Sequence, residues 1–106
     1  MYKRLAVFAA VFGLALSTAV ARAGDPVAGK QAFDACVGCH GIPGYSNVYP
    51  SFRVPKLGGQ HAQYLINALN AYKNGDRPHE TMRSQGASLS DQAIADIAAY
   101  LSGLAD

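Results

Sequence analysis

The chain has 106 residues, with nine basic and seven acidic side chains, two cysteines and no tryptophan. It contains no basic tract and no interleaving of aromatic and basic residues, which excludes nucleic acid from the expected partners. Two cysteines allow one disulfide at most, and a bridge between residues three apart would close too small a loop to stabilise the fold much.

The first 23 residues have the pattern of a secretory signal peptide. The basic pair Lys3-Arg4 precedes a mostly apolar run, residues 5–20, and Ala21-Arg22-Ala23 is a small-x-small cleavage sequence. The alternative is an uncleaved membrane anchor, but a run of about 16 residues is shorter than the ~20 that a bilayer requires. We therefore expect cleavage after Ala23 and export to the periplasm.

Removal of this leader leaves residues 24–106 as one small domain. The leader carries three of the nine basic residues and none of the seven acidic ones, so the remainder has a net charge of −1. A chain of this size has a small hydrophobic core, and its fold often needs further stabilisation by a disulfide, a metal or another cross-link.

Helical signals begin at the start of this domain. Asp25 is a good N-cap and Pro26 suits the first helical position, so we expect a helix that runs through Phe33 into Cys36. Residues 41–59 are rich in glycine and proline and show no strand alternation, which predicts a loop.

A second helix is predicted from near Gln60, and it ends at Asn74 or Gly75. Its apolar residues recur at helical spacing: Leu65, Ile66, Leu69 and Tyr72. The polar, aperiodic segment 76–88 follows as a loop, in which Pro78 could start a short helical turn. A loop of this length in a small domain usually has a function.

The last predicted helix has the clearest signals. Ser90 is a good N-cap, Asp91 favours the first turn, and Gly103 ends the helix. Its apolar stripe consists of Ile94, Ile97, Ala98 and Leu101. The sequence thus predicts an all-α domain of three main helices joined by long loops, without strands.

The segment CVGCH, residues 36–40, allows three interpretations. A thioredoxin-like dithiol would need a strand before the motif, and none is expected. A zinc site could combine Cys36 and Cys39 with one or two of the histidines His40, His61 and His79. The isolated positions of His61 and His79, and the crowding of His40 beside Cys39, disfavour it.

The third interpretation is a covalent haem site. Residues 36, 39 and 40 share one face at a helix end, because positions i, i+3 and i+4 are neighbours. Two thioethers, at Cys36 and Cys39, can then hold one edge of a porphyrin while His40 binds the iron. This is the favoured interpretation.

Met82 is the candidate for the other side of the iron. It is the only methionine after the leader and lies 42 residues beyond His40. This places it in the predicted loop 76–88, for which the sequence shows no structural role. A thioether opposite an imidazole favours ferrous iron and raises the reduction potential. The structural alternative is a gap-filling core methionine. The rival ligands are His79 and His61, and an open site would admit small ligands or peroxide.

The motifs resemble those of small, soluble, bacterial monohaem cytochromes of class I, and also one half of the tandem dihaem cytochromes. The resemblance rests on CVGCHG, on PKLGGQHAQYLINALNAYKNGDR and on HETMRSQGASLSDQAIADIAAYL, and it covers nearly all of residues 25–105. It implies an all-α class I cytochrome c fold wrapped round one covalent haem c, with the first and last helices crossing where Gly29 and Phe33 meet Tyr100.

The resemblance also implies that a proline carbonyl accepts the N–H of the His40 imidazole, and Pro50 has the matching position. Such a bond would orient the ring. Residues 41–54 depart from the family pattern. Tyr45, Tyr49 and Arg53 in this segment could bind the haem propionates or face solvent.

The expected function is periplasmic electron transfer by a monomer, without enzymatic activity, through transient docking of redox partners at an exposed haem edge. The alternatives are a haem-bearing relay subunit of a periplasmic redox enzyme complex, and a haem that binds gas or peroxide. Basic residues near the site could steer partners or serve only solubility: Arg53, Lys56, Lys73, Arg77 and Arg83.

Overall fold

The structure is a computed structural model that describes residues 13, 23–48 and 51–104. The predicted signal peptide therefore lies almost wholly outside the described residues, as do Tyr49 and Pro50. Among the described residues, no helix is long and apolar enough to cross a membrane.

The predicted first helix is present but divided. Helix α1 spans Pro26–Ala32, the 3₁₀ turn η1 spans Phe33–Ala35, and α2 spans Val37–His40. The Asp25 carboxylate accepts a hydrogen bond from the Val27 N–H at 2.9 Å, which confirms the predicted N-cap. The division places Cys36 between η1 and α2, as the N-cap of α2, and Cys39 within α2.

The prediction of a strand-free domain was wrong. Strand β1, Ser46–Val48, pairs antiparallel with β2, Ser51–Arg53, in a register that places Ser46 opposite Arg53. A hydrogen bond from the Val54 N–H to the Tyr45 carbonyl, at 3.0 Å, closes the base of this hairpin. Strands of three residues are too short to produce a readable alternation in the sequence.

The other two predicted helices form and end where predicted, although the second begins at Ala62 rather than near Gln60. Helix α3 spans Ala62–Asn74 and stops at Gly75, whose φ of 81° is the left-handed conformation that glycine adopts without strain. Helix α5 spans Asp91–Ser102, and the Ser90 hydroxyl caps it by accepting from the Ala93 N–H at 3.0 Å.

The segment expected to be mostly loop contains a helix, α4, at Glu80–Ala87. Only one residue of this helix, Gly86, is buried, and a Cβ there would lie 3.3 Å from the Lys73 backbone nitrogen. Helix α4 therefore packs on α3 through a close backbone approach rather than through an apolar stripe, which explains why periodicity missed it.

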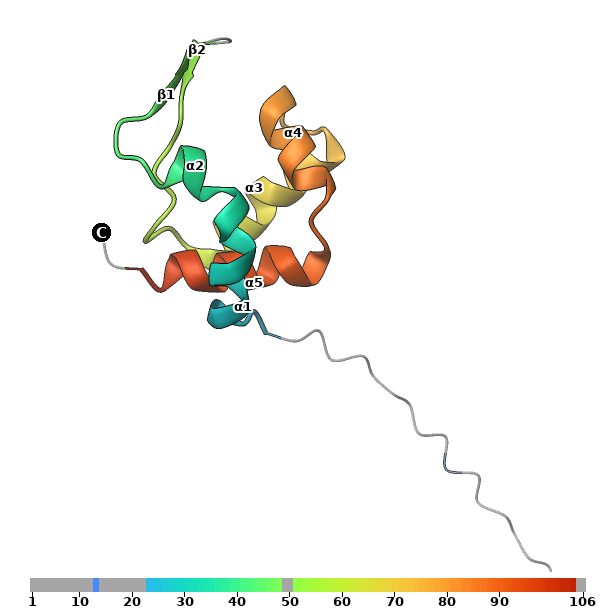
Figure 1. Cartoon of the computed structure of the whole chain (residues 1–106). Helices are drawn as coiled ribbons and strands as arrows, with labels where there is room; N and C mark the ends of the chain where they lie inside the picture. Colours follow the sequence, from blue (N-terminus) through green and yellow to red (C-terminus); the bar gives the residue numbers. More distant parts are fainter. Residues whose placement is uncertain (1–12, 14–22, 49–50, 105–106) are drawn as a thin grey trace, which may run out of the picture.

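Helices α1 and α5 cross at the base of the molecule, while the hairpin and α4 rise on opposite sides of it (Figure 1). A Cβ on Gly29 would overlap the Asp96 carbonyl oxygen, so only glycine permits this approach. The Phe33 and Tyr100 rings lie 5.8 Å apart at the crossing, as the family resemblance implied. The buried core cluster beside it consists of Phe33, Leu65, Ile97, Ala98 and Leu101.

Candidate functional site

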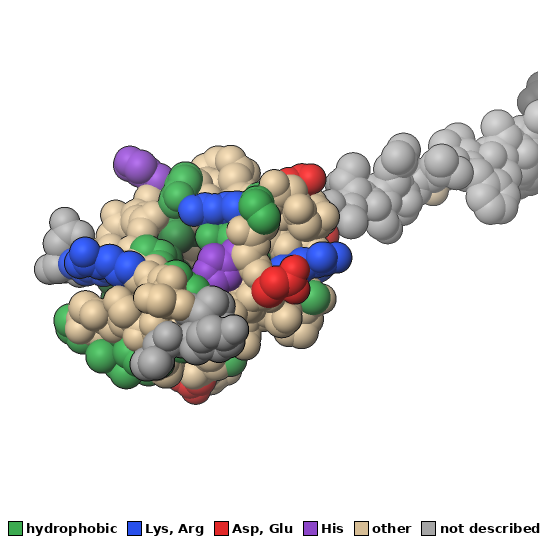
Figure 2. Space-filling view, turned by 90° about the horizontal axis from the view of Figure 1, so that it is seen from above, with side chains coloured by type: hydrophobic (Ala, Val, Ile, Leu, Met, Phe, Trp, Pro, Cys, Tyr) green, Lys and Arg blue, Asp and Glu red, His purple; other side chains and the backbone are tan. Residues whose placement is uncertain are grey.

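A cavity of about 430 Å³ occupies the space above the helix crossing. Residues of η1, α2, β2, α3, α4 and α5 line it, and most of its surface is apolar. Viewed from above, a histidine lies toward the middle of this face among hydrophobic side chains, with Lys and Arg side chains around them (Figure 2). The volume of the cavity falls in the range of about 300–1,000 Å³ that is usual for ligand pockets.

Cys36, Cys39 and His40 all line this cavity. The His40 N–H donates to the Cys36 carbonyl at 2.9 Å, so the predicted helical spacing does bring the three side chains to one face. The two cysteines are not joined to each other by a disulfide. Burial raises the pKa of the Cys36 thiol, and charge on Cys39 adds to this effect, whereas a redox-active dithiol needs a lowered pKa.

The imidazole of His40 is held by a proline carbonyl, but not by the one that was predicted. Nδ1 of His40 lies 2.9 Å from the carbonyl oxygen of Pro55. Pro50, the predicted acceptor, lies outside the described residues. The prediction chose a position five residues too early because it did not include the β1–β2 hairpin, after which the chain returns to His40.

This hydrogen bond determines which nitrogen of His40 carries the proton. A carbonyl oxygen can only accept, so Nδ1 of His40 must donate its hydrogen to Pro55. The lone pair of Nε2 is then free to bind a metal, in the arrangement that is common for metal-ligating histidines.

Met82 lines the same cavity from α4. The side chain is half-buried, and its neighbours Thr81 and Arg83 are exposed. Met82 is not part of the buried core cluster, which disfavours the reading of a gap-filling core methionine. The structure therefore brings together all four residues that the sequence singled out for the haem and its iron.

The two remaining histidines differ in position. His61 is exposed at the start of α3 and does not line the cavity. His79 is half-buried and does line it. A zinc site would need several ligands together, and across residues 23–48 and 51–104 no group of three or more His, Cys, Asp and Glu could hold a metal ion.

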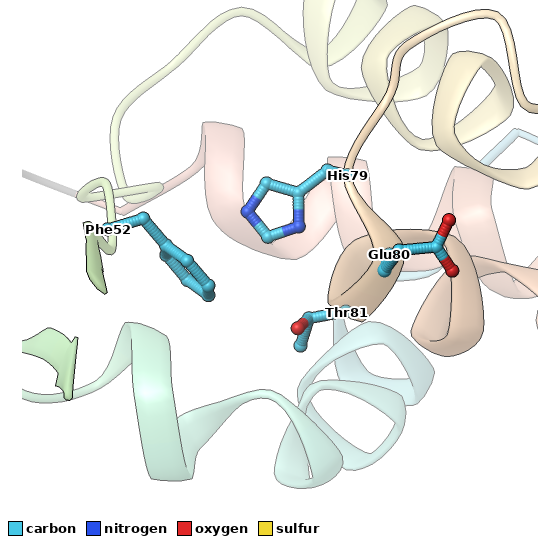
Figure 3. Close-up of a pocket in the computed structure, with 4 residues that line it drawn as sticks. All are labelled: Phe52, His79, Glu80 and Thr81. Atoms are coloured by element: carbon cyan, nitrogen blue, oxygen red, sulfur yellow. The ribbon is translucent and has the colours of Figure 1, made fainter. Parts of the chain in front are cut away.

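An aromatic cluster around His79 was not foreseen from the sequence. The His79 ring packs edge-on against the rings of Phe52 in β2 and Tyr72 in α3. The distances between ring centroids are 4.5 Å and 5.9 Å respectively. Phe52 and His79 approach each other beside the start of α4, while the Glu80 carboxylate points away from them (Figure 3). Because each of these residues comes from a different segment, only the tertiary structure reveals their contact.

The basic residues around the site have different surroundings. Arg53 and Arg77 line the cavity, and the guanidinium of Arg77 stacks 4.7 Å above the Tyr72 ring. Lys73 donates to the Leu89 carbonyl. Of the two suggested propionate partners that the structure describes, Arg53 borders the cavity and Tyr45 does not.

Comparisons with known proteins identify relatives of this chain. Cytochrome c-554(548) of Halomonas halodenitrificans is 42% identical over 83 residues, which are 76% of this chain and 96% of that protein. Cytochrome c4 of Pseudomonas aeruginosa is 42% identical over 78 residues, but these form only 37% of its length. The chain therefore matches nearly all of the first protein and little more than a third of the second.

A solved structure extends the similarity to the fold. The crystal structure of reduced recombinant cytochrome c4 from Pseudomonas stutzeri matches with a TM-score of 0.58 and 32% identity, over 77% of this chain and 50% of that one. A family model described as Cytochrome c matches residues 26–105. With a helical fold, a CVGCH motif and a cavity at that motif, the chain belongs to the cytochrome c family.

Proposed function

We propose that this chain is a periplasmic one-electron carrier in which Cys36 and Cys39 form the thioethers to haem c and His40 and Met82 bind its iron. The observation that supports this most strongly is that all four residues line one cavity, although Met82 lies 42 residues beyond His40. The proposal includes export by a signal peptide cleaved after Ala23, and a monomeric mature protein.

The family and the motif support the cofactor and the class of function directly. As a cytochrome c with one Cys-x-x-Cys-His motif, the chain binds one covalently attached haem c. It is an electron carrier rather than an enzyme, and its partners are transient redox partners. Haem supplies one-electron chemistry between Fe(II) and Fe(III), with a potential set by its axial ligands and surroundings.

The protein residues supply position, polarity and exclusion of water. Pro55 orients the His40 ring and leaves Nε2 available. Iron held by the imidazole of His40 and the thioether of Met82 would be stabilised as Fe(II), with a higher potential than iron held by two histidines. Leu65, Ile97 and Leu101 form an apolar floor beneath the site, which keeps water away from it.

The open side of the cavity is the proposed docking face for an electron donor and an acceptor. Transient docking requires only a small patch of modest affinity. Arg53 and Arg77 at this cavity could steer acidic partners, an effect that added salt would weaken.

The experiment that tests the proposal uses the native extract of the periplasm. A free carrier should elute as a single small haem protein, and its spectrum should change reversibly between oxidised and reduced forms. The reduced form should not bind carbon monoxide at neutral pH, because both axial positions are filled. Co-elution with a larger enzyme would favour the relay-subunit alternative, and carbon monoxide binding would favour an open site.

A further inference from the structure

His79 forms an unusual N-cap that connects directly to Met82. Its Nδ1 accepts a hydrogen bond from the Met82 backbone N–H at 3.2 Å, at the first turn of α4. Since a backbone N–H can only donate, Nδ1 must be unprotonated and Nε2 must carry the hydrogen. His79 and His40 thus adopt opposite tautomers at the same cavity.

Capping alone does not require a histidine. Serine, threonine, asparagine and aspartate are the usual N-caps because their short side chains reach the same N–H groups. The ring of His79 also contacts Phe52 of β2 at 4.5 Å and Tyr72 of α3 at 5.9 Å, both edge-on. Tyr72 is in turn covered by Arg77. One imidazole therefore links the Met82 backbone to two other elements of the cavity wall.

We infer that His79 is a positioning residue, which holds the start of α4 so that the Met82 thioether remains directed at the iron. This inference rests on the proposed function, in which Met82 is an axial ligand. Without the hydrogen bond to His79, the Met82 backbone is no longer connected to Phe52 and Tyr72 through the His79 ring. The Met82 thioether then leaves the iron more often. An external ligand then competes for the iron more successfully.

The test measures binding of added imidazole to the oxidised holoprotein. His79→Phe keeps an aromatic ring but removes the acceptor, and we expect imidazole to bind about fivefold more tightly, the factor that corresponds to loss of a typical N-cap. His79→Asn restores the acceptor without the ring, so its affinity should lie close to the wild-type value. An equal gain in both variants would overturn the assignment to the hydrogen bond.

Ser90→Ala is the matched control. It removes an N-cap of the same i to i+3 geometry from α5, and Ser90 does not line the cavity. Stability should fall while imidazole affinity stays unchanged. Wild-type affinity in His79→Phe, or a gain in Ser90→Ala as large as in His79→Phe, would overturn the inference.

A second measurement does not depend on the folding of any variant. Nitrogen NMR of the reduced wild-type holoprotein should show an unprotonated Nδ1 at His79, and a protonated Nδ1 would refute the inferred role. Failure of the underlying function is recognised separately. If Met82→Ala leaves the iron coordination of the wild type unchanged, Met82 is not a ligand. If Met82 does bind the iron but the His79 variants bind imidazole as the wild type does, only the positioning role of His79 is overturned.

Discussion

Gly29 of α1 lies against the backbone of Asp96 in α5, so closely that a Cβ would overlap the Asp96 carbonyl oxygen and lie 2.9 Å from the Tyr100 Cβ. The crossing that supports the floor of the haem cavity thus depends on the absence of one methyl group. We expect Gly29→Ala to lower the free energy of unfolding by about 1–3 kcal/mol, through overpacking. For a domain of this size the melting temperature should fall by roughly 4–8 °C per kcal/mol.

Thermal unfolding of the holoprotein measures this effect. Gly103→Ala is the control, because a Cβ there meets only ordinary contacts, the nearest at 3.5 Å. Equal melting temperatures for Gly29→Ala and the wild type would contradict the described approach of the two helices.

Replacement of Met82 should open one axial position. In Met82→Ala we expect the reduced protein to bind carbon monoxide and the oxidised protein to lose the weak absorption band of thioether-ligated ferric haem. The potential should fall, since the ligand that favours Fe(II) is gone. Ser84→Ala is the control, because this exposed residue of α4 does not line the cavity. Persistence of the thioether band in Met82→Ala would exclude Met82 as the ligand.

The two cysteines should each contribute one thioether bond. Cys36→Ser and Cys39→Ser should each yield less haem protein, with haem held at one point instead of two, because serine cannot form the carbon–sulfur bond. Extraction with acidified acetone should leave haem on the wild-type chain and remove it only from a double variant. Complete extraction from the wild type would refute covalent attachment through these residues.

Asp96 should make the stability of the fold depend on pH in the acid range. Hydrogen bonds from the Asp25 N–H and the Gln92 side-chain amide, both at 2.8 Å, lower the pKa of the Asp96 carboxyl. The stabilisation is therefore fully present above the ordinary value of about 3.9, and it is lost as the pH falls through the lower pKa of the folded state.

Denaturant unfolding between about pH 2 and pH 7 measures this contribution. Asp96→Asn should be less stable than the wild type at neutral pH, and the difference should shrink in acid. Asp34→Asn, which removes an exposed carboxylate of η1, is the control. A stability difference that is constant across this pH range would show that the Asp96 charge does not contribute.

The sequence predicted best what local chemistry determines. The caps at Asp25 and Ser90 and the left-handed stop at Gly75 depend on neighbouring residues only, and all three are present. The CVGCH motif is also local, and its three functional side chains line one cavity as expected.

Features that depend on distant partners were missed. The strands of the hairpin gain their hydrogen bonds only from each other, and α4 lacks an apolar stripe because it packs through Gly86. The choice of Pro50 instead of Pro55 followed from the unseen hairpin. The contact of His79 with Phe52 and Tyr72 joins three separate elements, so no spacing rule could indicate it.

The hairpin leaves the site after His40 and returns to it at Pro55, and its base is closed by the bond between Val54 and Tyr45. Both ends are thus anchored independently of what lies between them. Insertions or deletions that preserve the strand pairing can therefore reshape this part of the surface without displacing the imidazole. Because Phe52 contacts His79 and Arg53 lines the cavity, such changes must keep both residues in place to leave the site intact.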